Sequence, residues 1–298
     1  MFMRTAILAG TAILAVSQTP EKAPEKTIEL ILRSSLGLQF RSNTGAQTLS
    51  RCLSSLGPWR TLLVDGGQML SRLLLGFCLI TSLPVLVTAQ ATTIRNPVDI
   101  DTFMKSYRLH PKPDLIPGFI QLIHTMEPAQ KTIATHSIVG FFSEIFLANP
   151  SHVPEWLQSL PTDDEQLKGI LNRAVDLSKA GGVLSESGHS GFLNDEYWGA
   201  FFATGNSRFI DQLVEQLSYC DERNDLDLFL AGVTAKWSLA SAAQSDPAVR
   251  LILQDPNRKD TPEIKRQIAD LLTAPDPTIF KIQAKEVVRQ QRALGKWK

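Results

Sequence analysis

The stretch from Trp198 to Gln212 reads WGAFFATGNSRFIDQ and decides the fold of the chain. Its aromatic and apolar residues recur at helical spacing, pause at Thr204-Gly205-Asn206, and resume in a second amphipathic segment. Apolar residues three or four positions apart indicate an α-helix, and Gly followed by Asn marks a turn. The stretch therefore predicts a helical hairpin.

Two further stretches have the same organisation, at Phe142 to Trp156 and at Trp237 to Leu251. The three hairpins begin 56 and then 39 residues apart, so the repeat is irregular. One hairpin cannot bury its whole apolar stripe, whereas a stack of hairpins can. The sequence thus predicts an all-α fold, an irregular helical-hairpin array that is a degenerate form of an α-solenoid.

Residues 92–298 contain no run in which Val, Ile or Thr alternates with polar residues, so no strand is expected. Ser151, Thr162, Asp246 and Thr261 are suitable N-caps, and Gly181-Gly182 is suited to end a helix. The expected helices span residues 98–109, 115–126, 129–148, 153–160, 163–180, 194–203, 207–220, 226–243, 247–253, 262–273 and 277–294.

The segment Met69 to Ala91 reads MLSRLLLGFCLITSLPVLVTAQA and has the three parts of a signal peptide. Arg72 gives a positive start, residues 73–87 form an apolar run, and Ala89-Gln90-Ala91 gives a small-x-small cleavage site. The apolar run is shorter than the roughly 20 residues of a permanent membrane helix. We therefore expect cleavage and export to the periplasm or the medium, with a membrane anchor or a buried core helix as the alternatives.

The signal-like segment is preceded by 68 residues, although a signal peptide should begin a chain. Either Met69 is the true start, or residues 1–68 form a real, unstructured extension. The first interpretation needs one mis-assigned start and is favoured. The expected organisation is an amino-terminal extension (1–68), a signal peptide (69–91) and an all-helical domain (92–298).

Composition sets limits on the function. Apolar residues make up 43% of the chain and charged residues 20%, which suits a globular protein. Residues 92–298 hold 22 Lys and Arg against 26 Asp and Glu, so this domain is mildly acidic and is not expected to bind nucleic acid. Of the three cysteines, only Cys220 lies in that domain, where we expect a buried, inert thiol.

The sequence contains no motif that predicts a catalytic residue, a metal ligand or a cofactor site. Gly188 to Phe192 reads GHSGF and lacks the last Gly of a nucleophile elbow. The five histidines have none of the spacings of a helical zinc site. Acidic residues at 163–165 and 195–196 fall in the first turns of expected helices, where the helix dipole favours negative charge, and those at 221–227 lie in an expected polar linker.

Two groups of residues are candidates for a binding surface. The first is aromatic, and it comprises Tyr197, Trp198, Phe201, Phe202 and Trp237. Core packing explains these residues most simply. The alternative is the wall of a groove for a ligand or a peptide, which would require Tyr197 and Trp198 to be exposed.

The second candidate is the carboxyl-terminal helix, where Lys281, Lys285, Arg289 and Arg292 recur at helical spacing. Cations near the end of a helix offset its dipole, and a terminal repeat needs a polar outer face. The alternative is contact with a membrane surface or an acidic partner.

The sequence WGAFFATGN at 198–206, followed by Arg208 and by KWSLAS at 236–241, resembles patterns in exported bacterial all-helical proteins of unknown function. The resemblance covers roughly residues 190–255. It implies a helical fold and an exported location, and it implies no activity.

These observations favour an exported, helical-repeat-like binding or interaction protein with a protein or peptide partner and no cofactor. The alternatives are an exported enzyme whose active site is assembled from distant residues, and an assembly factor tethered to the membrane through residues 69–91.

Overall fold

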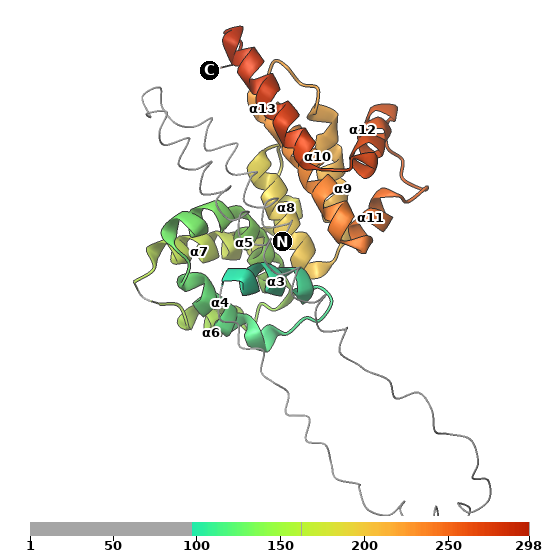
Figure 1. Cartoon of the computed structure of the whole chain (residues 1–298). Helices are drawn as coiled ribbons and strands as arrows, with labels where there is room; N and C mark the ends of the chain where they lie inside the picture. The colour runs from blue at the N-terminus through green and yellow to red at the C-terminus, as the bar shows by residue number, and fades with distance from the viewer. Residues whose placement is uncertain (1–96, 162, 298) are drawn as a thin grey trace, which may run out of the picture. The chain divides into compact units, whose positions relative to one another are not determined.

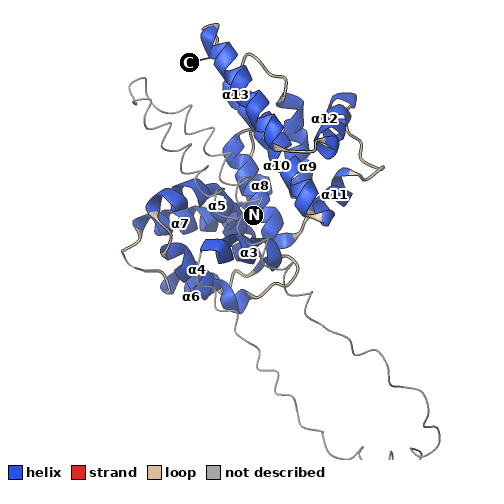
Figure 2. Ribbon diagram, in the orientation of Figure 1, coloured by secondary structure: helices blue, strands red, loops and turns tan. Residues whose placement is uncertain are grey.

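The computed structural model describes residues 97–161 and 163–297, and the predictions made for residues 1–96 lie outside them. Every regular element in the described ranges is helical, without a strand, as Figure 2 shows. The all-α prediction is therefore confirmed for this part of the chain.

The elements follow one another with short connections (Figure 1). Their bounds are α3 (Pro97–Tyr107), η1 (Pro113–Leu115), α4 (Ile116–His124), α5 (Pro128–Ala148), α6 (Val153–Gln158), α7 (Glu165–Ala180), η2 (Val183–Ser185), α8 (Gly191–Thr204), α9 (Ser207–Gln216), η3 (Leu217–Tyr219), α10 (Leu226–Ser245), α11 (Pro247–Leu253), α12 (Pro262–Thr273) and α13 (Thr278–Ala293). Each α-helix coincides with a helix expected from the sequence, with ends that shift by a few residues.

Most of the predicted helix ends are also observed. The side chain of Asp246 accepts a hydrogen bond from the Ala248 N–H, and that of Thr261 accepts one from the Ile264 N–H. Gly181 ends α7 in the left-handed conformation. Two predicted N-caps are wrong: α6 follows His152 without a side-chain cap, so Ser151 does not cap it, and α7 is capped by Asp164 in place of Thr162.

Helices α5 and α8 lie at the centre of the first part of the fold. Ten consecutive residues of α5, Ser137 to Phe146, are buried, and so are eleven of α8, Leu193 to Ala203. A helix buried on all sides must be surrounded by other helices. Helix α5 accordingly packs between α7 and α8 (Figure 1).

Two glycines allow α5 and α8 to approach closely. A Cβ atom on Gly140 would overlap the backbone carbonyl of Glu196, and a Cβ atom on Gly199 would overlap that of Ser137. Because Gly140 belongs to α5 and Gly199 to α8, the backbones of the two helices touch at both positions. This crossing fixes which side chains of α5 and α8 face each other.

Helix α10 has the corresponding role in the second part, where it contacts α8, α9, α11, α12 and α13. Its contact with α13 includes two reciprocal cation–π interactions. Lys236 of α10 lies 4.6 Å from the centre of the Phe280 ring of α13, and Lys281 of α13 lies 5.3 Å from the centre of the Trp237 ring of α10. Such contacts fix the rotation of α13 about its own axis.

The chain turns back after α13. Gly295 has a positive φ of 70°, and the turn that follows buries Trp297 against Phe229, with ring centres 5.1 Å apart. The side of α13 that faces α10 is therefore held by the cation–π contacts near its start and by the Trp297 contact after its end. None of the described helices is long and apolar enough to cross a membrane.

Candidate functional site

The aromatic candidates lie in the core. Tyr197, Trp198, Phe201, Phe202 and Trp237 are at most 3% exposed. The Trp198 indole donates a hydrogen bond to Ser238 at 2.9 Å, and the Tyr197 hydroxyl donates one to Gln212 at 3.3 Å. The groove interpretation is therefore wrong in this structure, because rings at this burial leave no open wall for a ligand.

The basic candidates on α13 divide into two pairs. Lys281 is half-buried over Trp237, and Arg292 is half-buried as well. Lys285 and Arg289 are exposed, and Arg289 forms an ion pair with Glu286 at 2.7 Å. Lys281 thus takes part in packing, whereas Lys285 and Arg289 face the solvent.

Exposed apolar residues share this solvent side of α13. Ile282 is 65% exposed and Ile279 is 45% exposed, while Phe280 and Ala284 on the opposite side are buried. We call Ile279, Ile282, Lys285 and Arg289 the docking face. Only the cations of this helix were expected from the sequence to form a binding surface, so neither isoleucine was predicted.

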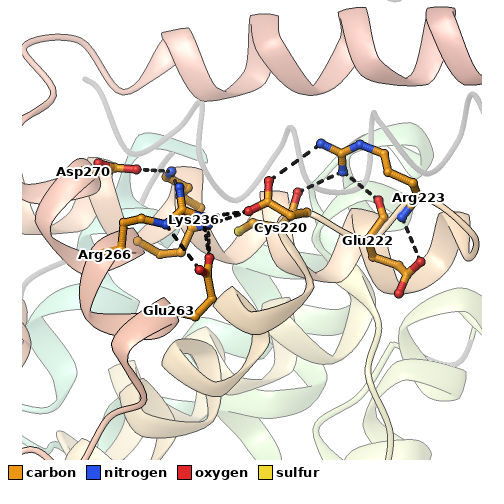
Figure 3. A network of polar contacts seen from close by, with 9 residues as sticks. Cys220, Glu222, Arg223, Lys236, Glu263, Arg266 and Asp270 are labelled. Carbon is orange, nitrogen blue, oxygen red and sulfur yellow. Dashed lines mark hydrogen bonds and ion pairs between the residues drawn. The ribbon is translucent and has the colours of Figure 1, made fainter.

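A network of ion pairs surrounds Cys220 at the junction of η3, α10 and α12 (Figure 3). Arg266 of α12 binds Glu263 at 2.6 Å and Asp221 at 2.8 Å, and Lys236 of α10 binds Asp270 at 3.2 Å. Burial raises the pKa of Cys220 to about 12. The thiol stays protonated at neutral pH and is a poor nucleophile, which agrees with the predicted inert cysteine.

A second polar cluster lies where α5, α7 and α8 meet, and we call it the Glu196 cluster. The Glu196 side chain is only 2% exposed, and its Oε1 accepts hydrogen bonds from His136 Nδ1 at 2.9 Å and from Arg173 Nη2 at 3.1 Å. Arg173 Nη2 also binds the two carboxylate oxygens of Glu186 at 3.0 and 3.2 Å. Four residues from three helices and one loop are thereby connected.

The electrostatics of the two carboxyl groups in this cluster differ. Burial alone would raise the pKa of Glu196, but the hydrogen bond from His136 and the charge of Arg173 outweigh it, so the pKa is lowered. Burial raises the pKa of Glu186, and the nearby charge of Glu196 raises it further. The cluster therefore holds one firmly ionised carboxylate and one that takes up a proton more readily.

The Glu196 cluster has the residue types of an acid–base site, since paired carboxyl groups with opposite pKa shifts can exchange protons. Its central carboxylate, however, is enclosed by helices. Its hydrogen bonds to His136 and Arg173 connect α8 with α5 and α7. We assign the cluster to joining α5, α7 and α8.

The sequence predicts Glu196 in the first turn of a helix that starts at residue 194. This prediction is wrong, because α8 starts three residues earlier, which moves Glu196 into the second turn and onto the side facing α5. No pattern in the sequence relates Glu196 to His136, which is 60 positions away.

Within residues 97–161 and 163–297, no group of three His, Cys, Asp or Glu residues is arranged to hold a metal ion. Comparisons of the chain with protein-family models, with curated proteins and with solved structures find no match.

Proposed function

We propose that this chain is a binding protein that docks on its partner through the docking face of α13. One observation carries the proposal: Ile282 is 65% exposed on a helix whose opposite side is buried, and the exposed cations of Lys285 and Arg289 follow it on the same side of the helix. An apolar residue with cations beside it on the same helix face combines an affinity for apolar surface with an attraction to negative charge.

Export is the second part of the proposal. The positive start, the short apolar run and the small-x-small site of residues 69–91 support a cleaved signal peptide. The turns at Thr204-Gly205-Asn206 and before Asp246 support an irregular array of helical hairpins. The docking face would then act outside the cytoplasm.

The test compares the full-length protein with one variant and one control in the extract of a host cell. Ile282→Asp places a charge at the centre of the docking face, and Leu251→Asp makes the same kind of change at a 70% exposed leucine on α11. The expected result is that wild-type protein and the Leu251→Asp control elute from a sizing column, or sediment, with a larger particle. Ile282→Asp should elute as free protein.

Two results would contradict the proposal. In the first, wild-type protein and Ile282→Asp both elute at the size of the free chain. In the second, Leu251→Asp releases the protein as fully as Ile282→Asp does, so that the effect does not belong to α13. Circular dichroism of each purified variant checks that the helices remain intact.

A further inference from the structure

We infer that the partner of the docking face is an anionic lipid bilayer. The inference rests on the proposed function, because it names the surface on which the docking face binds. Three properties of α13 support it. They are its positive charge compared with the rest of the described chain, its fixed orientation about its own axis, and the arrangement of its exposed side chains.

Charge is distributed very unevenly along the described residues. Residues 278–297 hold five Lys and Arg against one Glu, whereas residues 97–277 hold 15 Lys and Arg against 25 Asp and Glu. An anionic surface attracts the first segment and repels the second. The protein would therefore approach such a surface with α13 foremost.

The rotation of α13 is fixed before it meets any partner. Phe280 and Ala284 are buried, and Lys281 is held over Trp237, so the docking face always points away from α10. A helix held in this way does not need to fold on binding. It cannot turn its buried side toward a bilayer either, so the contact is limited to the exposed residues.

The exposed side of α13 forms a ridge rather than a groove. Ile279 and Ile282 lie one turn apart, and Lys285 and Arg289 continue the same side toward the carboxyl end. Leu294 and Lys296 are also exposed just after the helix, and Leu294 is 67% exposed. A bilayer accepts apolar side chains at the level of its headgroups while long cationic side chains reach the phosphates.

An acidic protein is less well suited to this ridge, because it would have to supply a matching apolar groove with an acidic rim. The salt bridge between Arg289 and Glu286 does not oppose lipid binding. Its two side chains are 73% and 46% exposed, and such pairs contribute little energy, so Arg289 can exchange Glu286 for a lipid phosphate.

The experiment measures binding of the purified protein to vesicles. The full-length gene is expressed, and the soluble form that the host releases is purified, with mass spectrometry showing that all variants share one amino terminus. Vesicles of phosphatidylglycerol and phosphatidylethanolamine are compared with vesicles of phosphatidylcholine. Bound protein is measured by co-sedimentation at low and at high salt.

Three variants are compared with the wild type. Lys285→Glu/Arg289→Glu reverses the charge of the docking face, and Ile282→Ser removes its central apolar side chain. Lys179→Glu/Lys265→Glu reverses the charge of two exposed lysines on α7 and α12, so it matches the change in net charge away from α13.

The wild type should bind the anionic vesicles, and raising the salt concentration should weaken this binding. The charge reversal should weaken it at least about tenfold, since each cation near an anionic surface contributes on the order of 1 kcal/mol. Ile282→Ser should weaken it severalfold, and the Lys179→Glu/Lys265→Glu control should bind within about twofold of the wild type.

The inference is overturned if the wild type binds phosphatidylcholine vesicles equally well, or if the control pair loses as much binding as the docking-face pair. It is also overturned if the wild type binds no vesicle. The absence of vesicle binding does not overturn the proposed docking if, in the cell extract, wild-type protein still elutes with a larger particle and Ile282→Asp elutes as free protein. The two results together would assign the docking face to an acidic protein.

Discussion

At the scale of single residues, Asp164 is a buried carboxylate that several donors stabilise in its ionised form. It precedes α7, where it accepts hydrogen bonds from the Leu167 N–H at 3.0 Å and from His124 Nδ1 at 2.9 Å, and it forms an ion pair with the buried Lys131. Burial alone would raise its pKa, but these three donors outweigh burial and lower it to about 2.

This lowered pKa predicts how stability depends on pH. Because the unfolded chain binds the proton at a higher pH than the folded one, the contribution of Asp164 is complete above about pH 4 and is lost as the pH falls toward 2. Asp164→Asn should reduce the free energy of unfolding at pH 7 by about 2 kcal/mol. The difference from the wild type should disappear near pH 2, as measured by urea denaturation.

Asp163→Asn is the matched control, since Asp163 is exposed and lies one residue away. It should change the unfolding free energy by less than about 0.5 kcal/mol. An Asp164→Asn variant as stable as the wild type at pH 7 would show that the three donors do not stabilise the carboxylate.

At the scale of elements, the crossing of α5 and α8 depends on glycine. Gly140 faces the backbone of Glu196, and a methyl group there has no free space. Gly169 of α7 is exposed, with no atom within 4 Å of the position of a Cβ. Two Gly→Ala substitutions in helices therefore have opposite expected effects.

Gly140→Ala should destabilise the protein by about 3 kcal/mol, because α5 and α8 must separate to admit the methyl group. Gly169→Ala should stabilise it by up to about 1 kcal/mol, because alanine favours the helix and meets no obstacle. Thermal denaturation followed by circular dichroism measures both. Equal melting temperatures for the two variants would contradict the close packing of α5 on α8.

At the scale of the whole described molecule, one core joins the helices around α5 to those around α10. Most of the buried apolar residues between Ile100 and Phe280 form one cluster, and Phe229, Leu230, Ala284 and Trp297 form a smaller second one. Arg108, which directly follows α3, adds a polar connection, since it binds Asp246 before α11 at 2.5 Å and lies over the Phe201 ring at 4.5 Å. Both parts should therefore unfold together.

Hydrogen exchange measured by mass spectrometry tests this expectation. The most protected amides of α5 and of α10 should open with free energies that agree within about 1 kcal/mol. Arg108→Met should lower both by a similar amount, about 3 kcal/mol, because it leaves Asp246 without its buried partner. Opening of α10 well before α5 would show that the two parts unfold separately.

The sequence by itself determined where the helices lie. Apolar spacing, prolines, glycines and caps such as Asp246 and Thr261 act over a few residues, so they could be read directly. The sequence also indicated a basic carboxyl-terminal helix and an inert Cys220. Both depend on residue type more than on distant neighbours.

Only the tertiary structure decided which side of each helix is buried. In α5 and α8 the apolar residues surround the helix, so periodicity gave no preferred face, and the aromatic cluster could be read as core or as groove. The position of α13 on α10 determined that Phe280 is buried and Ile282 is exposed. The pairing of His136 with Glu196 depends on the glycine crossing of α5 and α8, because long-range contacts are set by the packing of whole helices and leave no local pattern in the sequence.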